Sequence, residues 1–204
     1  MMSRLLLSAW LLGLLVIAST SCTNSPYAHE LSQADSLSKE LDVVKQASAK
    51  IDSSGITACN DTITKHITYL QRNFTDTLNR ESAIIISDYA RLRKSIKQLK
   101  DKHRELMYEL KNTNEQLTSL SKDIRNEKIQ KEDLERFNKK FPDAGADATR
   151  MLFQQYIDAE TQVVQKMHLD TEMLIKGYSK VQEKFNDWKP AVETIVSETK
   201  EKNS

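Results

Sequence analysis

Apolar residues recur at helical spacing along most of the chain, and the longest regular series lies in the middle. Twelve positions follow one another there at alternating steps of four and three residues, and ten of them are apolar or aromatic. A series of this length is typical of a coiled-coil seam, so it predicts a long helix packed against other helices. Its members are Ile85, Tyr89, Leu92, Ile96, Leu99, His103, Leu106, Leu110, Thr113, Leu117, Leu120 and Ile124.

Two shorter series precede this seam. One runs from Ala34 to Ile51 and predicts a first helix over 31–53, which Gly55 would close in the left-handed conformation. The other runs from Ile63 to Leu78 and leads directly into the seam. Because neither Gly nor Pro occurs from 56 to 141, the pattern predicts helix over 58–126 and leaves open whether it is continuous through a stutter near Leu78.

The C-terminal third predicts a short helix over 129–140, a turn at FPDAGAD and a long helix over 147–189 that Asp147 caps. The long helix carries a second heptad series with one extra four-residue step. The expected inward positions are Leu152, Tyr156, Ala159, Val163, Met167, Thr171, Leu174, Tyr178, Val181, Phe185 and Trp188.

Pro190 lacks the N–H that a helix interior needs, so we expect a break there and a last helix over 190–201. Two long seams joined by a short connection fold back most simply as an antiparallel pair. The first helix, about 33 Å long, would cover only part of a hairpin longer than about 60 Å. The sequence therefore predicts an all-α fold with a single elongated domain over 31–203, an antiparallel coiled-coil hairpin with an additional N-terminal helix that forms a partial three-helix bundle.

The N-terminal segment MMSRLLLSAWLLGLLVIASTSC has a different pattern. Arg4 precedes an apolar run from Leu5 to Ala18, and small residues follow, which is the layout of an export signal peptide. As a helix the run would be about 21 Å long, whereas a membrane-spanning helix must cross about 30 Å. We expect residues 1–21 to be removed after export.

The end of this segment, IASTSC, resembles the lipobox of bacterial lipoproteins. Ser19 stands where the common lipobox has Leu, and this relaxed form is similar to that of Bacteroidota and spirochaete lipoproteins. The resemblance implies that Cys22 carries the lipid, with fatty acyl chains such as palmitate, and that 22–30 forms a tether. The alternative is an ordinary secretory signal that leaves Cys22 as an unmodified thiol.

Charge is balanced overall but not locally. Without residues 1–21 the chain has 29 basic and 29 acidic residues, so nothing in its net charge favours nucleic acid as a partner. Between 91 and 104, however, the basic residues Arg91, Arg93, Lys94, Lys97, Lys100, Lys102 and Arg104 meet only Asp101.

This basic stretch has two interpretations, a free anion-binding patch or a face balanced by a neighbouring helix. A hairpin folded about residue 135 would place it near the acidic residues of the last long helix, and that complementarity favours the internal contact. Those residues are Asp158, Glu160, Asp170 and Glu172.

The sequence contains no constellation typical of catalysis or metal binding. No Glu-x-x-His pair occurs, no Ser, Cys or Thr lies beside a histidine base, and the loop at Asp143 has Gln154 where a calcium loop needs Glu. Cys59 would be a buried apolar thiol and His103 a neutral seam histidine. We therefore expect a protein that is not an enzyme and has no cofactor or metal, with Cys22 as its single site residue.

These patterns together favour a membrane-anchored helical lipoprotein that serves as a scaffold or adaptor for an envelope partner protein. It would lie on the periplasmic side of the outer membrane. Two alternatives stay open, a lipid- or small-ligand-binding helical module and a lipoprotein exposed on the cell surface that contacts host molecules. The seam could also pair two copies of the chain, so a homo-oligomer is a further possibility.

Overall fold

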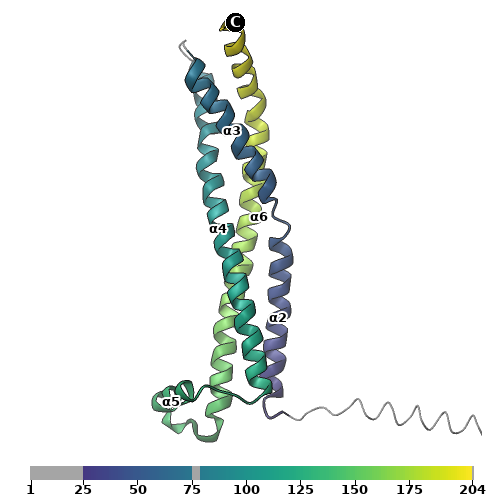
Figure 1. The fold of residues 1–204 in the computed structure, drawn as a ribbon, viewed down its shortest axis with the longest axis vertical. Helices are drawn as coiled ribbons and strands as arrows, with labels where there is room; N and C mark the ends of the chain where they lie inside the picture. The colour runs from purple at the N-terminus through teal and green to yellow at the C-terminus, as the bar shows by residue number, and fades with distance from the viewer. Residues whose placement is uncertain (1–24, 75–78, 204) are drawn as a thin grey trace, which may run out of the picture.

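The computed structural model describes residues 25–74 and 79–203, which form an elongated bundle of helices (Figure 1). No strand occurs in these residues, and the fold class is all-α, as predicted. In chain order the elements are α2 (Ala28–Ser48), α3 (Ser53–Asn73), α4 (Arg80–Arg125), α5 (Lys131–Lys140), the 3₁₀ helix η1 (Pro142–Asp147) and α6 (Ala148–Lys202).

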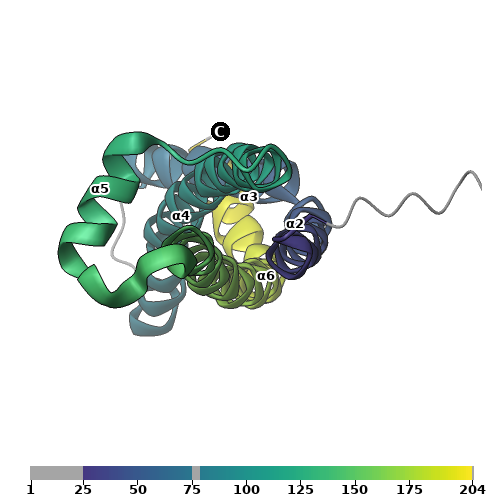
Figure 2. The same ribbon diagram turned by 90° about the horizontal axis from the view of Figure 1, so that it is seen from below.

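The bundle is three helices thick in both of its halves. α4 and α6 form the antiparallel hairpin, while α2 and α3 follow each other along one edge and pack against both long helices (Figures 1 and 2). With 55 residues at 1.5 Å each, α6 is about 82 Å long. α2 covers only part of the hairpin, as predicted, and α3 extends the third layer along the rest of it.

The first helix ends earlier than predicted. α2 ends at Ser48, and the Asp52 carboxylate then caps α3 by accepting a 2.7 Å hydrogen bond from the Gly55 N–H. Gly55 is therefore in the first turn of α3 and does not close the preceding helix. Its role is steric, since a Cβ there would overlap the Asp52 carboxylate. The hydrogen bond from Gly55 lowers the pKa of Asp52.

The helix predicted over 58–126 is two antiparallel helices. α3 ends at Asn73 and Phe74 is extended, while the Asn79 side chain starts α4 by accepting a 2.8 Å hydrogen bond from the Ser82 N–H. A hairpin lets the apolar stripe of α3 enter the same core as the α4 seam, which a straight helix could not do. The stutter predicted at Leu78 lies outside the described residues.

Two predictions at the ends of α6 are also wrong. α6 continues through Pro190, because buried residues on both sides of it, including Phe185 and Val192, hold the helix in the core. Asp147 occupies the N-cap position, but its side chain makes no capping hydrogen bond and lies 3.8 Å from Arg150 in an ion pair.

The inward face of α6 near its start differs from the predicted one. Tyr156 is half-buried, and Ala159 and Val163 are exposed. The buried positions instead continue the regular heptad series of the second half of the helix back to its first turns. That series is Phe153, Ile157, Glu160, Val164, Met167 and Thr171, and all are buried except Glu160, its one charged member, which is half-buried.

Candidate functional site

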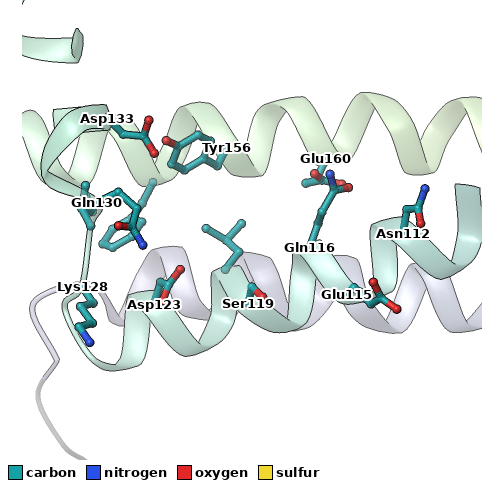
Figure 3. A pocket seen from close by; sticks show the side chains of 13 residues that line it. Asn112, Glu115, Gln116, Ser119, Asp123, Lys128, Gln130, Asp133, Tyr156 and Glu160 are labelled. Carbon is teal, nitrogen blue, oxygen red and sulfur yellow. The ribbon is translucent and has the colours of Figure 1, made fainter. Parts of the chain in front are cut away.

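A polar hollow lies between α4, α6 and the segment that leads into α5. This polar pocket has a volume of about 630 Å³ (Figure 3). It is lined by Asn112, Glu115, Gln116, Ser119, Leu120 and Asp123 of α4, by Lys128, Ile129, Gln130 and Asp133 before and in α5, and by Phe153, Tyr156 and Glu160 of α6.

Glu160 is the most unusual side chain of the polar pocket. It projects from the inward face of α6 toward Gln116 of α4 (Figure 3), and its Oε2 atom is buried without a hydrogen-bond partner. Burial raises the pKa of Glu160, because a charged carboxylate loses its hydration there. The pocket thus holds a carboxylate whose charge is poorly compensated by the protein.

Tyr156 lines the polar pocket on the side nearest α5 and connects α6 to that short helix. Its hydroxyl donates a hydrogen bond to the Asp133 carboxylate, and the two side chains lie next to each other at the end of the polar pocket beside α5 (Figure 3). Burial, together with this hydrogen bond, raises the pKa of Tyr156. The contact joins α5 to α6, so the short helix is a fixed part of the pocket.

The polar pocket has the chemistry of a binding surface for hydrogen-bond donors. Four carboxylates, Glu115, Asp123, Asp133 and Glu160, line it with the single cation Lys128. Within residues 25–74 and 79–203 no three His, Cys, Asp or Glu side chains are grouped so that they could hold a metal ion. Nothing in the pocket pairs a nucleophile with a base, so its residues can bind but form no recognisable catalytic set.

The site residue predicted from the sequence, Cys22, lies outside the described residues. Cys59 is buried, and burial raises the pKa of its thiol, as expected of a structural cysteine. His103 is half-buried beside Tyr178, with ring centroids 6.1 Å apart. Burial lowers the pKa of His103, and its Nε2 atom has no hydrogen-bond partner.

The basic stretch lies near only two of the four acidic residues predicted to face it. Leu99 lies against Gly177 and His103 against Tyr178, so residues 91–104 face 172–187, which includes Glu172. Asp170 lines a hollow together with Lys102, whereas the segment that contains Asp158 and Glu160 lies further along α6. The hairpin is offset by about one heptad from the predicted fold about residue 135. No ion pair of the described residues joins this stretch to α6, and the prediction of an internal contact is wrong.

The stretch instead forms a basic groove on α4 beside α3. Its volume is about 770 Å³, and it is lined by Asn60, Ala90, Arg93, Lys94, Ile96, Lys97, Lys100, Asp101 and Arg104. Asp101 is already engaged by Arg104 at 2.7 Å, and Lys100 donates a 3.2 Å hydrogen bond to Thr57 of α3. The groove therefore presents positive charge that the bundle does not neutralise.

The sequence pattern contains a signal for Glu160. Counting heptads backward from Thr171 places Glu160 on the seam, whereas the predicted series places Ala159 and Val163 there. A charged residue on a seam marks a gap in the core. The polar pocket itself could not be predicted, because it depends on where α5 packs.

Comparison of the chain with family models, with curated proteins and with solved structures finds no match. Within the described residues no helix is both long and apolar enough to cross a membrane.

Proposed function

We propose that this chain is an exported helical lipoprotein, anchored through lipid on Cys22, that acts as a scaffold or adaptor for an envelope partner protein. The observation that carries the proposal is the place where the chain enters the bundle. α2 starts at the same end of the rod as α5 (Figure 1), and only two residues separate Ser25, the first described residue, from Cys22. A lipid on Cys22 would hold that end of a rod about 82 Å long at the membrane surface.

The entry point is firmly attached to the rod. The Arg150 side chain of α6 donates a 2.9 Å hydrogen bond to the Pro26 carbonyl and lies 3.3 Å from the buried Glu30 carboxylate. The Tyr27 ring packs edge-on against Phe153 at 5.2 Å. The predicted tether over 22–30 is therefore shorter, since α2 begins at Ala28 and the residues before it pack on α6.

The geometry favours an adaptor over the alternative of a lipid-binding module. An acyl chain needs an enclosed apolar cavity, whereas the polar pocket and the basic groove open on the surface and carry charged linings. The main core is filled by side chains with no exposed area, among them Val44, Ile63 and Tyr89. Such a rod presents long surfaces between helices, which suit a protein partner.

Lipid attachment is tested by labelling cells that produce the full chain with an alkyne-bearing palmitate. We expect label on the protein and recovery in the membrane fraction, and loss of both in Cys22→Ser. Cys59→Ser is the matched control and should keep both. Label that persists in Cys22→Ser would overturn the lipid anchor.

The adaptor role is tested by placing photo-crosslinking residues along the exposed faces of α4 and α6 in cells. We expect one envelope protein to crosslink at neighbouring positions, with loss of the crosslink when Cys22→Ser releases the rod. Protease treatment of intact cells separates the periplasmic location, which predicts protection, from the cell-surface alternative. Crosslinks that are absent or spread evenly over unrelated proteins would contradict an adaptor.

A further inference from the structure

The basic groove lies at one level of the rod where positive charge is concentrated. Residues 91–104 of α4 have seven basic side chains against Asp101, a formal charge of plus six. At the same level α3 (53–66) has one acidic and one basic residue, and α6 (172–187) has three of each, so neither neutralises α4. The full chain has a formal charge of only plus one, so the net positive charge is concentrated in this section of the rod.

The basic side chains of the groove are available to a partner. Arg93, Lys94 and Lys97 are exposed, and none has a carboxylate within ion-pair distance in the described part of the chain. Keeping like charges together without compensation destabilises the bundle, because each repels the others. An anionic partner would relieve that repulsion.

The shape of the groove indicates what kind of anion fits. Arg93, Lys97, Lys100 and Arg104 follow a single helical stripe along α4 that is about 16 Å long, or three helical turns. Ala90 provides apolar atoms beside this stripe, Ile96 lies buried beneath it, and Asn60 of α3 forms the second edge. A hollow between two helices that carries a straight basic stripe has the geometry that receives the acidic side of an amphipathic helix.

Two other anionic partners fit the groove less well. Single-stranded nucleic acid is held largely by stacking on aromatic rings, and no aromatic side chain lines the groove. Headgroups of the anchoring membrane are distant from it when the rod stands upright, since Lys97 is 28 residues, or about 42 Å, from the α5 end of α4. The concave, partly apolar surface also differs from the flat face that a bilayer would need.

We propose that the basic groove binds an acidic amphipathic helix of a partner protein, with carboxylates repeating at steps of four and three residues opposite Arg93, Lys97, Lys100 and Arg104. The inference rests on the proposed adaptor function and specifies the chemistry of its partner. Its test below needs no lipid on Cys22, so its failure is distinguishable from failure of the lipid anchor.

The experiment measures fluorescence anisotropy of a labelled synthetic helix that has leucines on one face and glutamates along its flank. The full chain is held in a detergent with a neutral headgroup. We expect saturable binding that weakens by at least about tenfold in Arg93→Glu/Lys97→Glu, since both charge pairs become repulsive. Binding should also weaken strongly as salt rises toward 0.5 M, because exposed charges are screened.

Lys176→Glu/Lys180→Glu is the matched control. These lysines are exposed on α6 at the same level of the rod, with the same spacing and the same change in charge. Affinity should stay within about twofold of the original protein, because the control leaves the groove intact. Circular dichroism confirms that each variant is folded, and Arg93→Gln/Lys97→Gln replaces the reversal if it is not.

Three results would overturn the proposal. One is no binding of the acidic helix, and another is an equal loss in the groove variant and in its α6 control. The third is tighter binding of a thymidine oligonucleotide or of phosphatidylglycerol vesicles, with the same dependence on Arg93 and Lys97, which would assign the groove to phosphate groups.

Discussion

The two halves of the rod differ in the charge of the polar groups that they leave unpaired in the interior. In the half that contains α3, Tyr89 is fully buried, its hydroxyl lies 3.2 Å from His66 Nδ1, and its ring stacks on Phe185 at 5.9 Å. In the half that contains α2, Glu160 and Glu30 each keep a buried carboxylate oxygen without a partner. The half that contains α3 also leaves His103 Nε2 and the Tyr178 hydroxyl without a partner, but burial keeps both groups neutral, whereas both unpaired carboxylate oxygens lie in the α2 half. Because burying an unpaired charged group costs more than burying a neutral one, the polar groups of the α2 half lower the free energy of unfolding more.

The largest effect should come from the core of the α3 half. Tyr89→Ala removes a ring that is in contact with both α3 and α6, so we expect the free energy of unfolding to fall by about 3–5 kcal/mol. Chemical denaturation measures the change. Tyr108→Ala is the control, since Tyr108 is 67% exposed, and it should cost less than about 0.5 kcal/mol. Similar losses in the two variants would contradict this account of the core.

A second prediction concerns the ion pair that fastens the α2 half. Arg150→Ala leaves the Glu30 carboxylate buried without its partner, so we expect a loss of about 1–3 kcal/mol in the free energy of unfolding. The double variant Glu30→Gln/Arg150→Ala removes the buried charge and should recover part of that loss. If the double variant is less stable than Arg150→Ala alone, the carboxylate is not the cause.

Replacing Glu160, the carboxylate on the seam of α6, should raise the free energy of unfolding instead of lowering it. Burial raises the pKa of Glu160, so the folded state disfavours its charged form. The free energy of unfolding therefore falls as pH rises above the pKa that Glu160 has in the unfolded chain. We expect Glu160→Gln to raise the free energy of unfolding by about 1 kcal/mol at pH 7 and by less at pH 4. Glu115→Gln, an exposed residue of the same pocket, should change little at either pH. An equal gain at both pH values would exclude charge burial as the cause.

The smallest predicted effect is the response of the histidines to acid. Burial lowers the pKa of His66 and of His103, so both favour the neutral form in the fold. The folded state is therefore most stable with respect to these two groups above the unfolded histidine pKa of about 6.5, and the free energy of unfolding falls as pH falls below it. In a Glu160→Gln background, which removes the opposing carboxylate, the denaturation midpoint should be lower at pH 5.5 than at pH 7.5.

His103→Leu should reduce this dependence on pH, whereas His168→Gln on the exposed surface should leave it unchanged. A dependence that survives in His103→Leu and also in His66→Gln would mean that other groups titrate. The two histidines would then not be the groups that make the free energy of unfolding depend on pH.

The heptad spacing was sufficient to predict the helical class and the seam of α4, because burial of one helical face leaves a periodic record in the sequence. It was not sufficient where two periodic segments adjoin without Gly or Pro. α3 and α4 share one continuous pattern, and the choice between a straight helix and a hairpin depends on which core is available to bury Ile63 and Ile67. Whether the chain forms a straight helix or a hairpin there depends on tertiary contacts, and the local sequence does not reveal it.

The prediction of charge pairing between α4 and α6 was wrong for a related reason. A heptad repeat fixes which face of each helix is inward but not how far one helix slides along the other. The offset was set by single contacts such as the close approach of Leu99 to Gly177, where the missing side chain admits the leucine. An offset of one heptad can preserve the buried positions and still change the surface pairs, so the ion pairs expected from the sequence are not formed.

The contact of Arg150 with Pro26 and Glu30 has a mechanical consequence. A force applied to the chain ahead of Ser25 does not first unwind α2 from its free end, because Arg150 bonds the chain to α6 at the point of entry. The load passes directly into the longest helix, which is itself packed along α4. Tension at one end of the rod is thus distributed along its length, and shear between two long helices resists it better than peeling of one short helix would.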